Sequence, residues 1–222
     1  MLPPVKSNGH IGLALLMMGV FIATRWPGLM PPNFSAAYGL LFCGGVYFRN
    51  RLAWWMPLAA MAVSDIGITF YYWKVHHIPF HWYPLVNYAA YGVLIALGRR
   101  CRPEMPWWKL LGGGVVGALL FYLITNTASW LLNPFGNTEY TRDWVGWLTA
   151  LTQGTAGHPP TWEFLRNTLS SGGLFTGLFA GAMKLADHLE SAAEKEAAEA
   201  PEESDEEAPS SPPNPQPEEA RA

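Results

Sequence analysis

Residues 57–70 read PLAAMAVSDIGITF, an apolar run that contains one carboxylate, Asp65. The apolar character extends over residues 52–73, which is long enough for a membrane-spanning helix of about 20 residues. An aspartate at the centre of such a helix costs about 2.5–3.5 kcal/mol on insertion scales, so it usually faces a partner or a water-filled cavity. The stretch therefore predicts a membrane helix and marks a position where function should be sought.

Five further apolar stretches share this near absence of charge, which a soluble helical domain would not tolerate on its outer faces. They occupy residues 10–26, 35–48, 83–98, 107–132 and 163–185. A short aromatic stretch at residues 144–151 lies in the longest connection and could follow the membrane surface or dip into it. We expect an all-α integral membrane protein with about six transmembrane helices in residues 10–186, after a short cytoplasmic N-terminus at residues 1–9.

The mean hydropathy of +0.09 hides a strong division of charge along the chain. Residues 187–222 hold twelve of the seventeen acidic residues and only two of the fourteen basic ones, so the tail carries about −10 and the body about +7. The tail is rich in Glu, Pro, Ser and Ala and has no aromatic residue, so it cannot bury enough apolar surface to offset the entropy of ordering. We expect a disordered, acidic, cytoplasmic tail whose first residues could extend the last helix.

The distribution of Lys and Arg predicts the orientation, because cytoplasmic loops retain an excess of basic residues. Six spans place both termini on one side, and that side has twice as many basic residues as the other. Eight lie with the termini: Lys6, Arg49, Arg51, Arg99, Arg100, Arg102, Lys109 and Lys184. Four lie on the opposite side: Arg25, Lys74, Arg142 and Arg166. Both termini are therefore expected in the cytoplasm.

Small residues at four-residue spacing predict close helix packing, because they let helix backbones approach in lipid. We expect the small residues of the fifth and sixth spans to pack within the chain, whereas those of the first span could equally face a separate subunit. The positions are Gly173, Gly177 and Gly181 in the sixth span, Gly113 and Gly117 in the fifth, and Gly19 and Ala23 in the first.

Polar residues gather toward the outer side of the spans, which predicts a water-accessible pocket open to the outside. At about 1.5 Å per residue, Asp65 lies about 20 Å from Arg51 and about 12 Å from Trp73. Asp65 could contact a ligand, form a structural ion pair with Arg25 or Arg166, or couple a proton or ion. The candidate substrate-binding residues are Arg25, Asn33, Asp65, Asn87, Asn126, Glu163, Arg166 and Asn167.

Three of these candidates have equally simple structural interpretations. Asn126 could form an interhelical hydrogen bond, and Glu163 and Arg166, three residues apart, could form a plain surface pair. His76, His77 and His81 invite a metal interpretation, since imidazole suits Zn, Cu or Ni, but an interfacial or pH-responsive loop explains them as well. We predict no metal site and no cofactor.

Catalytic and nucleotide-binding signatures are missing from the sequence. There is no phosphate-binding glycine loop, no nucleophile elbow and no paired-carboxylate arrangement. The two cysteines, Cys43 and Cys101, show no metal or disulfide spacing. We therefore expect a protein that is not an enzyme and has no nucleic-acid partner, and an intramembrane enzyme is disfavoured for want of a catalytic constellation.

Three segments resemble an uncharacterised family of bacterial multi-pass membrane proteins regarded as transport proteins. They read PPNFSAAYGLLFCGGVYFRNRLAWWMPLAAMAVSD, FYLITNTASWLL and FLRNTLSSGGLFTGLFAG, and the resemblance covers most of residues 25–185. It implies a transport protein of the bacterial inner membrane and assigns no residue a role. The architecture also resembles the substrate-binding subunits of energy-coupling-factor vitamin transporters, which associate with a transmembrane coupling subunit and ATPases. In that resemblance, Gly19 and Ala23 correspond to the helix that contacts the coupling subunit.

The leading hypothesis is a membrane transport protein that binds a small solute in an outward-facing pocket, with the lipid bilayer as its surroundings. It lacks an energy-coupling motif, so it would be a passive carrier, an ion-coupled carrier or a substrate-binding subunit. The alternative is a structural or interaction membrane protein whose intramembrane polar residues only lock helix packing.

Overall fold

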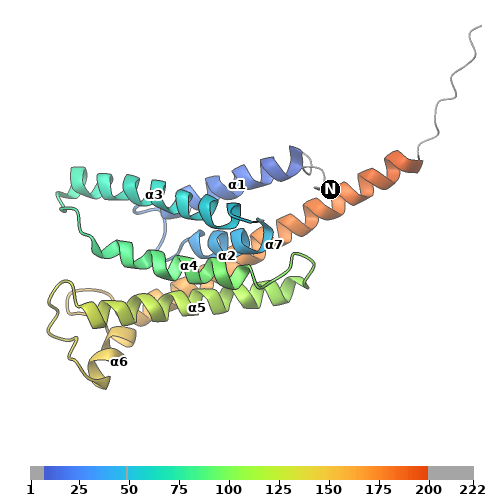
Figure 1. The fold of residues 1–222 in the computed structure, drawn as a ribbon. Helices are drawn as coiled ribbons and strands as arrows, with labels where there is room; N and C mark the ends of the chain where they lie inside the picture. The colour runs from blue at the N-terminus through green and yellow to red at the C-terminus, as the bar shows by residue number, and fades with distance from the viewer. Residues whose placement is uncertain (1–7, 49, 200–222) are drawn as a thin grey trace, which may run out of the picture. The chain divides into compact units, whose positions relative to one another are not determined.

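The computed structural model describes residues 8–48 and 50–199, and all of its regular elements are helical, as the apolar pattern predicts (Figure 1). Every expected span coincides with a helix to within a few residues, except that the last helix runs on well beyond its span. The elements are α1 (Asn8–Arg25), α2 (Ala37–Tyr47), α3 (Leu52–His76), the 3-10 helix η1 (Tyr83–Val86), α4 (Asn87–Gly98), α5 (Trp107–Leu132), α6 (Trp144–Thr152) and α7 (Thr161–Glu199). One compact unit ends at Asp187, and a second begins at His188.

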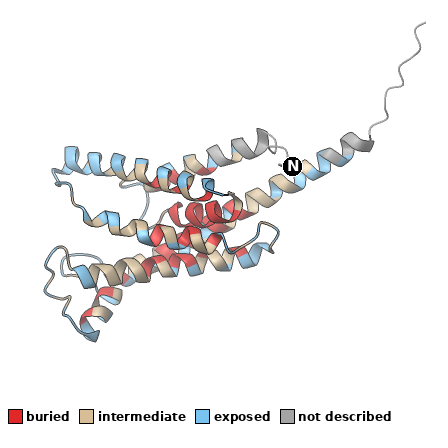
Figure 2. Cartoon of the chain, in the orientation of Figure 1, coloured by how far each residue is buried: buried red, intermediate tan, exposed pale blue. Residues whose placement is uncertain are grey.

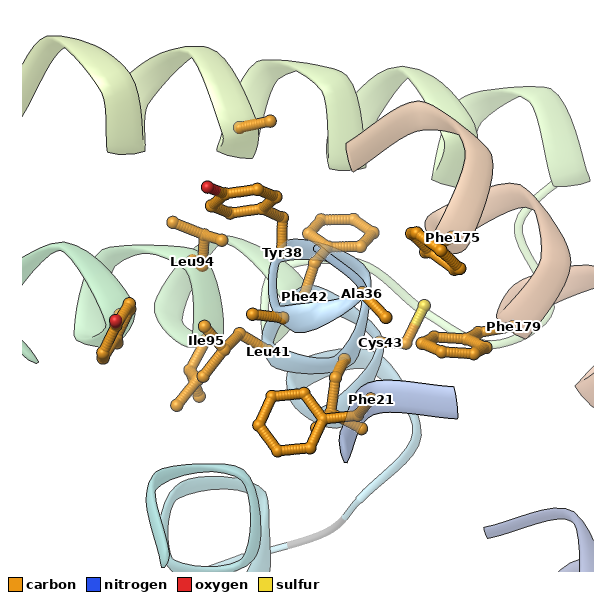
Figure 3. Close-up of a cluster of buried hydrophobic side chains, with 14 of the residues drawn as sticks. Phe21, Ala36, Tyr38, Leu41, Phe42, Cys43, Leu94, Ile95, Phe175 and Phe179 are labelled. Atoms are coloured by element: carbon orange, nitrogen blue, oxygen red, sulfur yellow. The ribbon is translucent and has the colours of Figure 1, made fainter. Parts of the chain in front are cut away.

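The core is built around α2, whose residues are buried from Ala37 to Val46. Its sequence, AYGLLFCGGVY, is uncharged and lacks a polar face, and a helix that is apolar all round is stable only when enclosed. Helices α1, α3, α4 and α5 all contact it. In Figure 2 the buried residues gather on α2 and on the parts of its neighbours that face it. Figure 3 shows Phe42 and Cys43 of α2 between Leu94 of α4 on one side and Phe175 of α7 on the other.

Glycines on α2 allow this enclosure, because they bring neighbouring backbones into direct contact. A Cβ at Gly39 would lie 2.8 Å from the backbone of Phe175 in α7, and one at Gly44 would lie 2.6 Å from Pro57 in α3. Gly45 faces Gly98 of α4, and a Cβ on either residue would collide with the other helix's backbone. Close helix contacts therefore surround α2, where the sequence predicted no small-residue face.

The glycine row of the last helix packs within the chain, as predicted. A Cβ at Gly173 would lie 3.3 Å from Val115, and one at Gly177 would lie 3.2 Å from Trp107, both on α5. The indole Nε1 of Trp107 also donates a hydrogen bond to the carbonyl oxygen of Gly177 at 3.0 Å. Gly181 lies against the same indole ring.

The other two predicted small-residue faces have different surroundings. Gly113 and Gly117 do not meet α7: a Cβ on the first would lie 2.6 Å from the Phe42 ring of α2, and one on the second would touch Leu94 and Leu97 of α4. On α5 it is Gly114 that meets α7, at Thr176. On α1, Gly19 has no described atom within 4 Å of a built Cβ, and Ala23 is exposed.

Two helices, α3 and α5, are long and apolar enough to cross a membrane. Only 22% of the most apolar part of each helix is buried, so these helices present apolar side chains outward rather than into a core. Exposed apolar surface of this kind indicates membrane association. The expected six spans are not found by this measure in the part of the chain that the structure describes. The helices α2 and α4 have only 11 and 12 residues, and α7 is long enough but too polar.

The last helix extends further than expected. It continues to Glu199, so residues 187–199 are helical where the sequence predicted the start of a disordered tail, and the alternative of a helical extension applies to them. The remainder of the expected tail, residues 200–222, lies outside the described residues. The segment has helix-forming Ala, Glu and Lys with no Gly or Pro, which explains the extension.

The long connection between α5 and α7 is ordered by side-chain hydrogen bonds to its backbone. Asp143 caps α6 by accepting from the backbone N–H of Gly146 at 2.8 Å, and Glu139 accepts from the N–H of Ala156 at 2.8 Å. The indoles of Trp130 and Trp147 bond to Thr141 and Thr127. The short aromatic stretch predicted here is therefore a capped helix that packs against the C-terminal end of α5.

The contact between α2 and α4 predicts an unequal response of two glycines in one helix. Gly98→Ala should lower the stability of the protein by about 1–3 kcal/mol, because the new methyl group meets rigid backbone of α2. Gly92→Ala is the control in the same helix, since its Cβ meets only a ring atom of Trp54 at 3.8 Å. Thermal unfolding of the purified protein in detergent, followed by circular dichroism, should separate them. Equal melting temperatures would contradict the contact.

The cap of α6 predicts a pH dependence confined to this helix. The N–H of Gly146, and then the hydroxyl of Thr141, bond the Asp143 carboxylate and hold its pKa below the usual value. The cap therefore acts fully above the pKa that Asp143 has in the unfolded chain, and it is lost as pH falls through the lowered folded value.

Hydrogen exchange, corrected for intrinsic rates, measures this effect at the first amides of α6. At neutral pH, Asp143→Ala should exchange faster than wild type, and the two should converge in acid. Asp143→Asn keeps an acceptor at every pH and should show no such convergence. A wild-type cap that persists in acid below the lowered pKa would refute the assignment.

Candidate functional site

The carboxylate in the apolar stretch, Asp65, forms an ion pair between two helices. Arg25 is the last residue of α1, and its Nη2 contacts Oδ1 of Asp65 in the middle of α3. Its Nε donates to the Ser64 hydroxyl at 2.6 Å, and Nη1 lies 3.9 Å from the Met61 sulfur. The side chains are 16% and 24% exposed, so the pair is largely withdrawn from its surroundings. Of the alternatives for Asp65, pairing with Arg25 is therefore the arrangement found.

A third helix joins this pair through Tyr88, in the first turn of α4. Its hydroxyl donates to Oδ2 of Asp65 at 3.0 Å, so both carboxylate oxygens have partners, one from α1 and one from α4. Helix α3 runs on to His76, which puts Asp65 about 16 Å from the C-terminal end of the helix and about 20 Å from its N-terminal end. Asp65 is thus nearer the middle of its helix than counting to Trp73 suggested.

The loop that follows α1 is held over the pair by bonds to α1 and α7. Thr24 accepts from the N–H of Ala36 at 3.0 Å, closing the loop onto the end of α1. Asn167 of α7 donates to the Pro32 carbonyl at 2.9 Å. Between them, Asn33 adopts a φ of 59°, a left-handed conformation that asparagine tolerates better than most residues. The proline-rich loop is therefore fixed rather than free.

A cavity of about 810 Å³ lies between this loop, the C-terminal half of α3 and the segment before α4. Its lining combines the ion pair with amides, a histidine and many aromatic rings, which is the composition of a ligand pocket: mostly apolar with a few convergent polar groups. The polar and aromatic lining residues are Thr24, Arg25, Trp26, Asn33, Phe34, Ser35, Tyr38, Asp65, Thr69, Tyr72, His81, Asn87, Tyr91 and Phe121.

Four of the eight candidate residues line this cavity: Arg25, Asn33, Asp65 and Asn87. The other four are absent from its lining. Asn126 donates to the carbonyl of Tyr122 one turn earlier in α5, and Asn167 anchors the Pro32 carbonyl.

The last two candidates lie at the start of α7. Arg166 is exposed and lies over the Trp162 ring at 5.5 Å. Glu163 occupies the first turn of α7, where a carboxylate favours the helix dipole. Neither residue lines the cavity.

Sequence reasoning missed the hydroxyl groups that complete the site. Ser64 adjoins Asp65 in the chain, so its proximity could have been inferred, but its bond to Arg25 depends on how α1 crosses α3. Tyr88 and Tyr91 were hidden because a tyrosine near a helix end resembles an interfacial anchor. Only the packing of α3 beside α4 shows that Tyr88 reaches the carboxylate.

The histidines do not form a metal centre with their neighbours. Within residues 8–48 and 50–199, no three His, Cys, Asp or Glu residues lie close enough to hold a metal ion. His81 instead accepts from the backbone N–H of Tyr83 at 3.3 Å and packs against Phe135. It also lines the cavity, a position that the sequence did not indicate.

Comparison with known proteins identifies a family for this chain but no relative of known function. No curated protein and no solved structure shows significant similarity to the chain. The sequence profile of a family of unknown function (DUF6580) matches residues 5–195, which covers every described helix nearly in full. The chain therefore belongs to the DUF6580 family.

Proposed function

We propose that this protein is a multi-pass membrane protein that binds a small solute from outside the cell, in the cavity beside the Arg25–Asp65 pair. The single observation that carries the proposal is that cavity, whose volume of about 810 Å³ lies in the range of small-molecule sites. Paired charges, amides and hydroxyl groups converge on it from α1, α3 and α4. The two charges of the pair compensate each other, which favours an uncharged or zwitterionic solute.

The proposed topology has α1, α2, α3, α4 with η1, α5 and α7 within a bacterial inner membrane and both termini in the cytoplasm. Basic residues from separate connections support it by lying at the end of the unit away from the cavity. Arg99 donates to the Asn50 carbonyl at 2.9 Å, and Lys184 of α7 donates to the Pro103 carbonyl at 2.9 Å. Under the positive-inside rule that end faces the cytoplasm, so the cavity faces outward.

The chain supplies no energy-coupling motif, so transport needs either a gradient or another subunit. A substrate-binding subunit of the energy-coupling-factor type is the form we favour, with a transmembrane coupling subunit and ATPases as partners. The open surface around Gly19 and Ala23 of α1 supports this choice, because no described residue fills the space above Gly19. Small residues at such a face permit close approach of a second helix.

One observation favours the second candidate, a structural membrane protein. Arg25 is bonded to Ser64 and Asp65 of α3, and Asp65 is also bonded to Tyr88 of α4. The three residues together lock the end of α1 and the first turn of α4 onto the middle of α3. A pair that serves only as a lock would need no ligand, and the next two experiments separate the possibilities.

A double-mutant cycle tests the lock. Arg25→Met alone should destabilise the protein by about 3–5 kcal/mol, because it leaves the Asp65 carboxylate unpaired in a largely buried site. Adding Asp65→Leu should recover most of this loss, because two apolar groups replace both charges. Chemical or thermal unfolding in detergent measures both variants. Additive losses in the double variant would show that the two residues act independently.

The ligand hypothesis is tested by the molecules that the purified protein retains. Asn87→Leu changes the cavity lining without touching the lock, so it should lower the amount of retained solute about tenfold. Asn126→Leu is the matched control, because Asn126 lies outside the cavity and bonds its own helix. Mass spectrometry of extracts from equal amounts of protein gives the comparison. Equal amounts of retained solute in wild type and Asn87→Leu would contradict the ligand hypothesis and would favour the structural role of the contacts among Arg25, Asp65 and Tyr88.

A further inference from the structure

A second cavity adjoins the first on the far side of Asp65. It has a volume of about 730 Å³ and lies between the outer half of α3 and residues 79–88. Five residues line both cavities: Asp65, Thr69, Pro79, His81 and Pro84. Asp65 therefore stands at the boundary between two adjoining spaces rather than at the end of one.

The two spaces differ in chemistry. Apart from the shared residues and Tyr88, the second cavity is lined by apolar side chains alone. They come from both walls, and three of them are strongly exposed: Ile66 at 70%, Phe80 at 70% and Leu85 at 62%. A hollow bounded by large, exposed apolar groups marks an interaction site for an apolar partner. Because α3 is one of the two helices apolar enough to cross a membrane, this hollow opens toward acyl chains.

We propose that the bound molecule is an amphiphile, with an uncharged or zwitterionic head in the first cavity and an apolar tail in the second. This inference rests on the proposed function and specifies its substrate class. The second cavity follows α3 from Ala62 to Trp73, a length of about 16 Å, which suits an extended hydrocarbon chain rather than a single small group. A wholly polar solute would leave this hollow without a partner.

The position of Asp65 explains why one molecule fits both spaces. Its carboxylate is held by Arg25 on the side of the first cavity and by Tyr88, which lines only the second. The polar groups are thus concentrated where a head group joins its tail. Such a molecule enters from the outer leaflet, sideways between α3 and the segment before α4.

The test compares molecules extracted with water and with chloroform–methanol from the purified full-length protein. Leu85→Trp and Ile66→Trp fill the second cavity from opposite walls, and both positions are exposed enough to accept an indole. Leu131→Trp is the control, because Leu131 is 50% exposed on α5 and lines neither cavity. We expect an amphiphile that is reduced about tenfold in both cavity-filling variants and in Asn87→Leu, and unchanged in the control.

Each other outcome overturns part of the argument. A polar solute lost only in Asn87→Leu would overturn the amphiphile and leave the proposed function intact. A hydrocarbon lost only in the two cavity-filling variants would show a ligand without a head group, which also overturns the amphiphile. Lipids retained equally by all variants would be ordinary bilayer background and would overturn both proposals. A melting curve and a single elution peak confirm that each variant is folded.

Discussion

The structure depends on the enclosure of one short helix. With eleven residues, α2 is only about 16 Å long, so it cannot cross a bilayer alone, and its apolar surface must be covered on every side. The glycines of α2 let the backbones of α4 and α7 come into contact with it, and they let the Pro57 ring of α3 pack directly on Gly44. The fold is therefore a ring of longer helices around a short central one.

The space enclosed by these helices is incompletely filled at the end where α2 begins. Because α2 stops short, the space beyond its first residues is closed by the loop before it and by the outer halves of α3 and α4, which is where the cavity lies. The polar groups there are held by the ring itself. Arg25, Asp65 and Tyr88 each come from a different helix, and their mutual bonds satisfy the charges in a largely buried site.

The sequence predicted the helices well, because apolar runs and their breaks are local features. It predicted both bounds of α5 correctly and placed the C-terminal end of α3 within three residues of its position in the structure. It predicted less of the site, since the cavity unites residues according to how the helices cross. Asn126, for example, does not reach the cavity, because its side chain donates a hydrogen bond to the backbone of its own helix. The central glycines of α2 were likewise overlooked, because they do not follow the four-residue spacing of a simple helix pair.

The proline that seats α3 on α2 has a mechanical consequence. Pro57 has no amide hydrogen, so α3 lacks one backbone hydrogen bond in its second turn. Below this point the helix is fixed through the contact of Pro57 with Gly44, and above it the helix is tied by Arg25 and Tyr88. Pro57 is therefore the point at which α3 can bend. Movement of the part of α3 that follows Pro57 would widen or narrow both cavities together, and the Arg25–Asp65 ion pair would resist that movement.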